Sequence, residues 1–313
     1  MDATAYHPDL RSIARWLPKG VGVPWLVRLL RRLPMPSSGV PGGITVSERP
    51  IADGHHARVR IIRPDSDGPP RPAIVWIHGG GFVLGAARQD DATCARLAQR
   101  LDAVVVSVEY RLAPEHPFPT PLEDCFDAYE LVLREAQALG IDPSRIIIAG
   151  QSAGAGLAAA LALLLHDRQR PAPRLQLLIY PMLDDRTALR VVDGRQHRLW
   201  NAASNHFGWS SYLGQPPGGA DVADIAAPAR RQHLAGLPPA WIGVGTLDLF
   251  HDEDVAYATR LREAGVPTTL TVVDGAFHGF DAVVPNKPVS RRFFEAQVAA
   301  IEAAIHQAAP APS

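Results

Sequence analysis

Five short apolar runs recur along the chain from residue 72 onward, and few polar positions interrupt them. The runs consist mostly of Val, Ile, Leu and Ala. Near-continuous apolar character of this kind is typical of strands that are buried on both faces of a parallel sheet. The runs lie at Ala73 to Ile77, Ala103 to Val108, Arg145 to Ala149, Leu175 to Ile179 and Ala240 to Val244.

Longer stretches with helical spacing lie between the runs, and a further strand candidate, Thr268 to Val273, follows the last of these stretches. Alternation of strands and helices predicts an α/β fold with a mostly parallel central sheet that is flanked by helices. The helical stretches lie at Ala92 to Leu101, Pro121 to Leu139, Gly156 to Arg168 and Asp252 to Ala264.

The region before residue 72 has a different pattern. An amphipathic stretch, Val23 to Leu33, is followed by Pro34-Met35-Pro36, which ends a helix. Short strand candidates follow at Ile44 to Ser47 and Ala57 to Ile62, with Asp53-Gly54 between them. This arrangement predicts an antiparallel hairpin at one edge of the sheet.

One interval, Asp185 to Ala235, contains no strand candidate, although it holds four large aromatic residues. We expect inserted helices here, between two central strands, that lie as a lid over the carboxyl edge of the sheet. The N-terminal arm is a second candidate for this lid. The aromatic residues are Trp200, Phe207, Trp209 and Tyr212.

Length and charge restrict the classes of protein that fit. At 313 residues, 47% of them hydrophobic, the chain suits one large α/β domain with an elaboration, or two small domains. The formal net charge of −1 gives no reason to expect nucleic acid or an anionic membrane as a partner.

The sequence also indicates a compartment. Two cysteines, Cys94 and Cys125, define no disulfide framework and suit a reducing environment. Residues 1–20 are polar and lack the apolar core of a signal peptide, and the longest apolar run, Leu157 to Leu165, is too short to span a bilayer. We therefore expect a cytoplasmic protein.

The third apolar run leads into Gly-Gln-Ser-Ala-Gly at residues 150–154 and then into a leucine-rich helix. Gly-x-Ser-x-Gly between a strand and a helix is typical of a nucleophile elbow, a sharp turn that lifts a serine above the sheet edge. Glycines suit such a turn because crowded positions accept only a residue without Cβ at low cost. The pattern also occurs by chance in ordinary loops, but this context makes Ser152 the first candidate for a nucleophile.

A dinucleotide-binding loop is a competing interpretation of the same region. Residues 154–159 fit Gly-x-Gly-x-x-Ala, follow a strand and open a helix. That site needs an acidic residue at the end of the next strand, about 20 residues on, to hold a ribose. No acidic residue ends Leu175 to Tyr180, and Asp184 and Asp185 come only after Pro181. The sequence therefore does not favour a dinucleotide cofactor.

A serine nucleophile needs a base, and the base needs an orienting carboxylate. When an elbow is present these follow in the order serine, acid, histidine. Asp248 comes just after the strand Ala240 to Val244, and His278 comes just after the last strand, beside a glycine that lets substrate approach. Asp252 and Asp254 are rival acids, with Asp252 the second choice, but helix capping and the helix dipole account for both.

A glycine-rich loop, His-Gly-Gly-Gly-Phe at residues 78–82, follows the first apolar run. Acyl transfer builds negative charge on a carbonyl oxygen, and preorganised backbone amides stabilise that charge. We expect Gly80 and Gly81 to donate these hydrogen bonds, with Gly79 as a third candidate and Ala153, after the nucleophile, as another donor. A merely flexible loop is the alternative. His78 itself is expected to brace the loop by a hydrogen bond.

Together these motifs resemble the bacterial hormone-sensitive-lipase family of carboxylesterases, from about Pro72 to Phe280. The match extends to Tyr110 to Glu115 and to Pro181 to Asp185. The resemblance implies an α/β-hydrolase core, a helical cap, and hydrolysis of short to medium acyl esters without a metal or organic cofactor. A small-molecule ester is the expected partner, and a homodimer is left open.

The resemblance also divides the chain. Residues 1–45 form an N-terminal helical arm that is part of the cap, and residues 186–225 form the cap insertion. Residues 46–185 and 226–313 are the two parts of the catalytic core.

Two positions depart from the family pattern. Gln151 precedes the serine where the family usually has Asp or Thr, and Leu249 follows the acid where many members have Pro. Neither change removes a reacting group, but Gln151 can alter the hydrogen bonds around the elbow. Lactones, amides and thioesters remain alternative substrates, and a ligand receptor without catalysis is a remote alternative.

Overall fold

The computed structural model describes residues 3–20, 27, 31 and 39–306. Within them the chain forms an eight-stranded sheet in the order β1-β2-β4-β3-β5-β6-β7-β8. The strands are β1 (Ile44–Pro50), β2 (Arg58–Pro64), β3 (Arg71–Ile77), β4 (Val104–Glu109), β5 (Ile141–Gln151), β6 (Leu175–Ile179), β7 (Ala240–Gly245) and β8 (Thr268–Val273).

The sheet is parallel from β4 to β8, and only β1 and β2 are antiparallel to their neighbours. The mostly parallel sheet and the antiparallel hairpin are thus confirmed. Each of the five apolar runs is a strand, and Ile77 at the end of β3 lies opposite Gly150 near the end of β5. This register brings the glycine-rich loop after β3 beside the elbow after β5.

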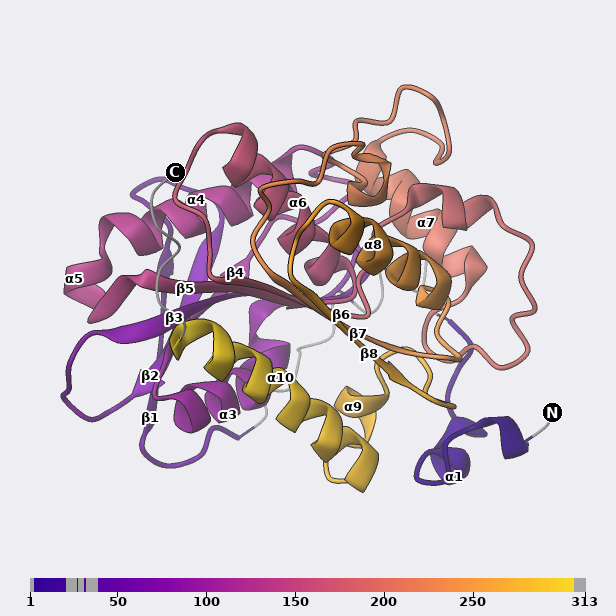
Figure 1. Cartoon of the computed structure of the whole chain (residues 1–313), viewed down its shortest axis with the longest axis horizontal. Helices are drawn as coiled ribbons and strands as arrows, with labels where there is room; N and C mark the ends of the chain where they lie inside the picture. The colour runs from indigo at the N-terminus through magenta and orange to yellow at the C-terminus, as the bar shows by residue number, and fades with distance from the viewer. Residues whose placement is uncertain (1–2, 21–26, 28–30, 32–38, 307–313) are drawn as a thin grey trace.

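Helices cover both faces of the sheet, so that two separate hydrophobic cores form. In Figure 1, α4, α6 and α8 lie on one face, whereas α3 and α10 lie on the other. The α-helices are α1 (Arg11–Ala14), α3 (Asp91–Leu101), α4 (Thr120–Arg134), α5 (Ala136–Leu139), α6 (Ala153–Asp167), α7 (Ala202–Leu213), α8 (His251–Glu263), α9 (Phe280–Val283) and α10 (Pro288–His306).

The structure differs from the expected helices in two places. The predicted helix Pro121 to Leu139 is divided into α4 and α5 at Glu135. The long C-terminal helix α10 was not predicted, although its apolar side chains pack on the core that α3 also covers. The predicted amphipathic stretch Val23 to Leu33 lies outside the described residues, apart from residues 27 and 31.

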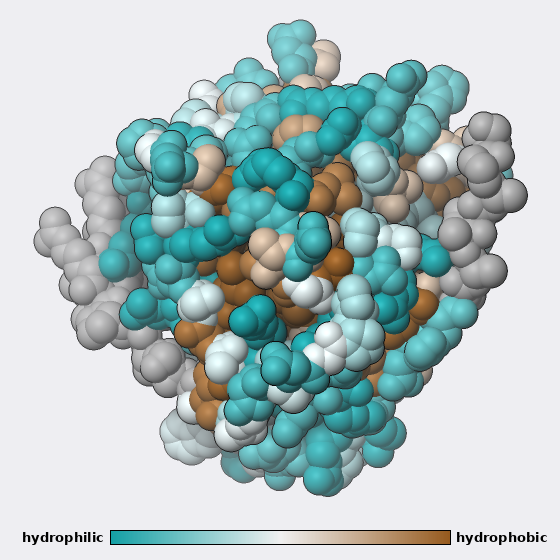
Figure 2. Space-filling model, turned by 90° about the vertical axis from the view of Figure 1, so that its left-hand side faces the viewer, coloured by the Kyte–Doolittle hydropathy of each residue, from teal (hydrophilic) through white to brown (hydrophobic). Residues whose placement is uncertain are grey.

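The interval after β6 contains no strand in the described chain before β7, as predicted, and holds η3 (Asp185–Leu189), α7 and η4 (Pro228–Arg230). Both α7 and α1 lie on the right of Figure 1, the side toward which β5 runs from α5. Figure 2 shows the opposite end, where a hydrophobic region is visible within a mostly hydrophilic surface. None of the described helices is both long enough and apolar enough to cross a membrane.

Candidate active site

Ser152 lies at the sharp turn between β5 and α6, with φ 56° and ψ −124°. A residue other than glycine in such a conformation costs about 1–3 kcal/mol, which the surrounding fold must offset. Its amide donates to the carbonyl of Ile179, at 2.8 Å, at the end of β6. The turn therefore holds the serine in one strained orientation at the carboxyl edge of the sheet.

The glycines of the elbow are required by close backbone contacts. A Cβ on Gly150 would lie 2.5 Å from the carbonyl oxygen of Gly154. A Cβ on Gly154 would lie 2.2 Å from the carbonyl oxygen of Ile77, at the end of β3. Since real Cβ atoms do not approach backbone oxygens this closely, the helix α6 can start beside β3 only because both positions lack a side chain.

Three side chains that are remote in the sequence form a hydrogen-bonded series. The Oγ of Ser152 lies 2.9 Å from Nε2 of His278, and Nδ1 of His278 lies 2.8 Å from Oδ2 of Asp248. The Asp248 side chain is fully buried and its other oxygen accepts from the amide of Phe250. A carboxylate at Nδ1 places the ring proton there, which leaves Nε2 free to accept the serine proton.

Aromatic side chains hold the His278 ring from two directions. The ring of Tyr180 lies edge-on at a centroid distance of 4.8 Å, and that of Phe250 lies edge-on at 5.2 Å. Tyr180 follows β6 and Phe250 follows β7. The imidazole is therefore held by the ends of two strands besides its own.

The rival acids lie elsewhere. Asp252 is exposed and its carboxylate lies 2.9 Å from Nδ1 of His251. Asp254 is fully buried, and neither of its oxygens has a hydrogen-bond partner among the described residues. Burial raises the pKa of Asp254 well above its ordinary value. The expectation that they cap the helix is wrong, because α8 has no side-chain cap, but both do lie in its first turn, where the helix dipole favours a negative charge.

The glycine-rich loop turns tightly beside the serine. The carbonyl of Gly80 accepts from the amides of Val83 and Leu84, and φ is 128° at Gly80 and 61° at Gly81. Among the described residues, none accepts a hydrogen bond from the amide of Gly80 or Gly81. These amides are therefore available to a ligand.

His78 braces this loop, as expected. Its Nδ1 lies 2.8 Å from the carbonyl oxygen of Gly79, and its ring stacks on Tyr110 at 4.3 Å. Burial lowers the pKa of His78 to about 4, so that the ring is neutral near pH 7 and donates to Gly79 from Nδ1.

A cavity of about 210 Å³ lies at the point where these groups meet. Ser152 and His278 line it together with the three glycines of the loop, residues 79–81. Much of the remaining wall is apolar, from Leu84, Leu199, Trp200, Ala282 and Val283, while Gln89, Gln151, Tyr180 and Gly279 complete it. A small molecule can therefore lie beside the serine with an apolar part against this wall and a carbonyl oxygen toward the loop.

Gln151 joins a polar network behind the elbow. Its Nε2 donates to Oδ1 of Asp90 at 2.7 Å, and Trp76 donates to the other oxygen at 2.8 Å. The Tyr180 hydroxyl lies 2.9 Å from Oδ1 of Asp281 and 3.3 Å from Oε1 of Gln151. Burial raises the pKa of Asp90 to about 7.

Sequence reasoning did not find Asp90, Tyr180 or Asp281, because each lies on a different element from the elbow. The one available signal was the unusual residue at position 151, whose longer side chain needs a partner. As for metals, the described residues contain no group of three or more His, Cys, Asp or Glu side chains that could hold an ion.

Comparisons with known proteins indicate one fold and one class of enzyme. The family described as having the alpha/beta hydrolase fold matches residues 74–282. Ethyl acetate hydrolase of Pseudomonas putida is 37% identical over 73% of this chain and 72% of its own length. Carboxylesterase NlhH of Mycobacterium tuberculosis is 32% identical over 88% of each protein.

Solved structures of esterases superpose on nearly the whole chain. A bacterial heroin esterase superposes with a TM-score of 0.87 at 34% identity, over 98% of this chain and 100% of that one. Esterase LipW of Mycobacterium marinum superposes with a TM-score of 0.85 at 35% identity, over 98% of both chains.

Proposed function

The chain belongs to the α/β-hydrolase family as a bacterial carboxylesterase of the hormone-sensitive-lipase type, and we propose that Ser152, His278 and Asp248 are its catalytic residues. The reaction is hydrolysis of carboxylic esters, here with short to medium acyl groups, through an acyl-enzyme. The observation that carries the assignment is the unbroken series of two hydrogen bonds, 2.9 Å and 2.8 Å long, from serine to histidine to aspartate.

In the first step His278 Nε2 takes the proton of Ser152 as Oγ attacks the ester carbonyl carbon. Asp248 stabilises the imidazolium that results, because its buried carboxylate accepts from Nδ1. The imidazolium then donates its proton to the leaving alcohol, and the acyl group remains on Oγ. In the second step His278 takes a proton from water as the water oxygen attacks the acyl carbon; the bond to Oγ then breaks, the imidazolium returns the proton to Oγ, and the carboxylic acid is released.

The tetrahedral intermediates carry negative charge on the former carbonyl oxygen. We assign its stabilisation to the amides of Gly80, Gly81 and Ala153, with Gly79 as a further donor. Removing a single donor of this kind typically costs about 3–4 kcal/mol of transition-state stabilisation. The location of the loop beside the serine supports the assignment, since a Cβ on Gly79 would lie 3.3 Å from the Cβ of Ser152.

The cavity volume supports the proposed substrate size. About 210 Å³ with an apolar wall suits a short to medium acyl or alcohol group. We further propose that the arm, residues 1–45, and the insertion, residues 186–225, form a cap over the site. Contacts between them support this, because the amide of Leu199, which lines the cavity, donates to the carbonyl of Pro18.

We place the enzyme in the cytoplasm, with a small-molecule ester as its only required partner. The two cysteines support a reducing compartment, since both are free and buried, on different helices. Burial raises the pKa of both thiols, which keeps them protonated and unreactive.

Substitution of the nucleophile tests the proposal. The wild type should hydrolyse p-nitrophenyl esters with the highest kcat/KM between C4 and C8, and a fluorophosphonate should label it once per chain. Ser152→Ala should retain its fold by circular dichroism, resist labelling, and lose activity by several orders of magnitude. Near-wild-type turnover by this variant would reject Ser152 as the nucleophile.

A further inference from the structure

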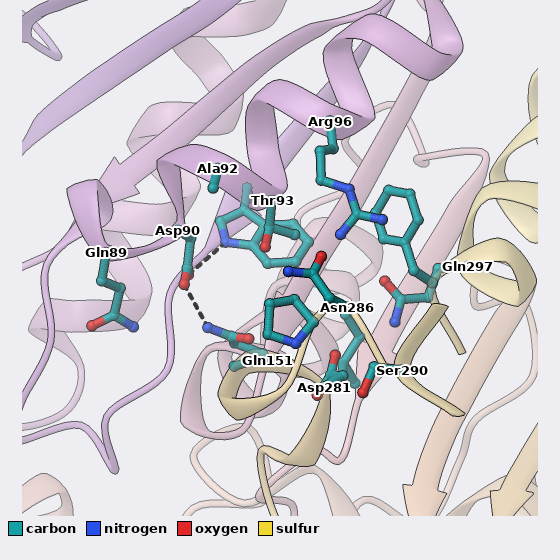
Figure 3. A pocket seen from close by; sticks show the side chains of 15 residues that line it. Gln89, Asp90, Ala92, Thr93, Arg96, Gln151, Asp281, Asn286, Ser290 and Gln297 are labelled. Atoms are coloured by element: carbon teal, nitrogen blue, oxygen red, sulfur yellow. Dashed lines mark hydrogen bonds between the residues drawn. The ribbon is translucent and has the colours of Figure 1, made fainter. Parts of the chain in front are cut away.

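A second cavity, of about 370 Å³, adjoins the catalytic one. Gln89, Gln151 and Ala282 line both cavities, so these three side chains form the boundary between them. Most of the remaining wall comes from α3 on one side and from α9, α10 and the loop between them on the other (Figure 3), and Trp76, Asp90 and Ile179 complete it. We call this second cavity the inner cavity. In contrast to the catalytic cavity, most of the side chains that line it and are labelled in Figure 3 are polar.

The end of the inner cavity nearest the elbow is occupied by groups that already have partners. Both oxygens of Asp90 accept hydrogen bonds, one from Gln151 and one from Trp76. Asp281 accepts from Tyr180. This end therefore offers a ligand little hydrogen-bonding capacity, and its two carboxyl groups disfavour an anion there.

Hydrogen-bond donors gather at the other end. The guanidinium of Arg96, from α3, extends toward the side-chain amides of Asn286 and Gln297 (Figure 3). Arg96 lies over the ring of Phe294, with its guanidinium carbon 3.9 Å from the ring centroid. In the part of the chain that the structure describes, no carboxylate forms an ion pair with it. The aromatic contact thus orients a cation that has no direct carboxylate partner, although the Glu295 carboxylate, which pairs with Arg100, lies near enough for its pKa to be lowered by the charge of Arg96.

Two buried polar atoms on α10 lack partners in the same wall. Ser290 and Gln297 are 2% and 1% exposed. Neither the Oγ of Ser290 nor the Nε2 of Gln297 has a hydrogen-bond partner among the described residues. Burying such groups without a partner is unfavourable, so a ligand that accepts hydrogen bonds would stabilise this wall.

The chemistry of this end defines the ligand group. A guanidinium and nearby amide and hydroxyl donors match a carboxylate, whose two oxygens can accept two parallel hydrogen bonds from arginine. An ammonium group would meet Arg96 with like charge. A neutral alkyl group would leave the donors unpaired.

We propose that the inner cavity is a subsite for a carboxylate-bearing end of the ester substrate, held by Arg96 with Gln297, Ser290 and Asn286. This inference rests on the proposed ester hydrolysis at Ser152. The preferred substrates are then esters that carry a free carboxylate, such as half-esters of dicarboxylic acids. The carboxyl groups of Asp90 and Asp281 direct this carboxylate away from the elbow, so that the ester group and not the acid faces Ser152.

Paired substrates test the proposal. The readout is the ratio of kcat/KM for p-nitrophenyl hemiglutarate to that for p-nitrophenyl valerate, which differ in the terminal group. Arg96→Gln should lower this ratio at least tenfold relative to the wild type. Arg291→Gln, which removes an exposed arginine of α10 that does not line the cavity, should leave the ratio unchanged. Equal ratios in the wild type and Arg96→Gln exclude a carboxylate on the acyl half of the substrate.

A second variant guards against a folding defect at Arg96. Asn286 is exposed in the loop before α10, and Asn286→Asp places a negative charge beside the expected carboxylate. It should also lower the ratio, by repulsion, in the pair of esters that Arg96→Gln affects, and an unchanged ratio in that pair contradicts the proposal. If the wild type does not hydrolyse p-nitrophenyl valerate at all, the proposed esterase function itself is rejected.

A second pair of esters identifies which half of the substrate enters the cavity. The carboxylate is moved to the alcohol, in the glycolate ester of butyric acid, with ethyl butyrate as its neutral partner. A fall of the ratio with Arg96→Gln in only one pair assigns the carboxylate to that half of the substrate. No fall in either pair overturns the subsite.

Discussion

At the scale of single residues, the identity of the acid is the assignment most open to a direct test. Asp248 is buried and bonded to His278, whereas Asp252 is exposed and contacts His251. Asp248→Asn should lower kcat by roughly 10³- to 10⁴-fold, because an amide no longer holds the imidazole in its reactive tautomer. Asp252→Asn should change kcat less than twofold. A larger loss in Asp252→Asn, measured with the same ester, would show that the acid is misassigned.

Glu253 is a second residue whose environment makes a prediction. Its Oε1 accepts from the amides of Leu183 and Asp184, but burial raises its pKa to about 8. Between the ordinary value of 4.5 and about 8, the folded protein keeps a proton that the unfolded chain has lost. The unfolding free energy therefore falls as the pH rises through this window, by up to about 1.4 kcal/mol per pH unit.

Glu253→Gln removes this titration and keeps an oxygen for the amide of Leu183. Urea unfolding of both proteins at several pH values from 5 to 8 measures the effect. The wild type should lose more unfolding free energy with rising pH than the variant does. Parallel curves would mean that Glu253 is ionised throughout, as a carboxylate bound to two amides.

At the scale of elements, the elbow depends on α6 starting directly against β3. A Cβ on Gly154 would lie 2.2 Å from the carbonyl oxygen of Ile77 and 2.4 Å from that of His78, both backbone atoms. Gly154→Ala should therefore destabilise the protein by about 3 kcal/mol or more and abolish activity. Gly42→Ala is the matched control, because nothing lies within 4 Å of its Cβ. The control should change stability by less than about 1 kcal/mol. Thermal unfolding measures the melting temperatures of the two variants. Equal melting temperatures would contradict the expected clash.

The central strands β3 to β7 could be predicted from the sequence because they are buried on both faces and so carry near-continuous apolar runs. Their order in the chain then located the loops that carry Ser152, Asp248 and His278, since parallel strands end at one edge. The structure brings these three side chains together. Their catalytic roles remain predictions until the variants are measured.

Most features of the structure that the sequence did not predict depend on contacts between distant segments. The burial of Asp254 is set by packing, which the acidic run at 252–254 does not reveal, since that pattern is typical of an exposed first turn. Helix α10 has an apolar face that packs on the core, but it lies beyond the last motif and carries no motif of its own. The network of Gln151 with Asp90 and Tyr180 joins three elements, and no local spacing predicts it.

At the scale of the whole molecule, a buried cation of the insertion, Arg198, helps to join the insertion to the arm. Arg198 is 1% exposed. It donates to the carbonyls of Ala14, Arg195 and His197 and lies 5.2 Å from the ring of Tyr6. The next two residues, 199 and 200, line the catalytic cavity. The wall of that cavity therefore depends on the position of the arm.

Arg198→Met should loosen this wall, because methionine fills similar space but leaves buried carbonyls without a donor. We expect a loss of about 2–3 kcal/mol of stability, and a rise in KM that exceeds the fall in kcat, since the reacting groups themselves are untouched. Arg195→Met is the control, because the Arg195 side chain is 82% exposed and, within the described residues, forms an ion pair with Asp193 alone. Unfolding in urea and ester kinetics measure both effects. An unchanged KM in a destabilised Arg198→Met would mean that the arm supports the fold without shaping the substrate cavity.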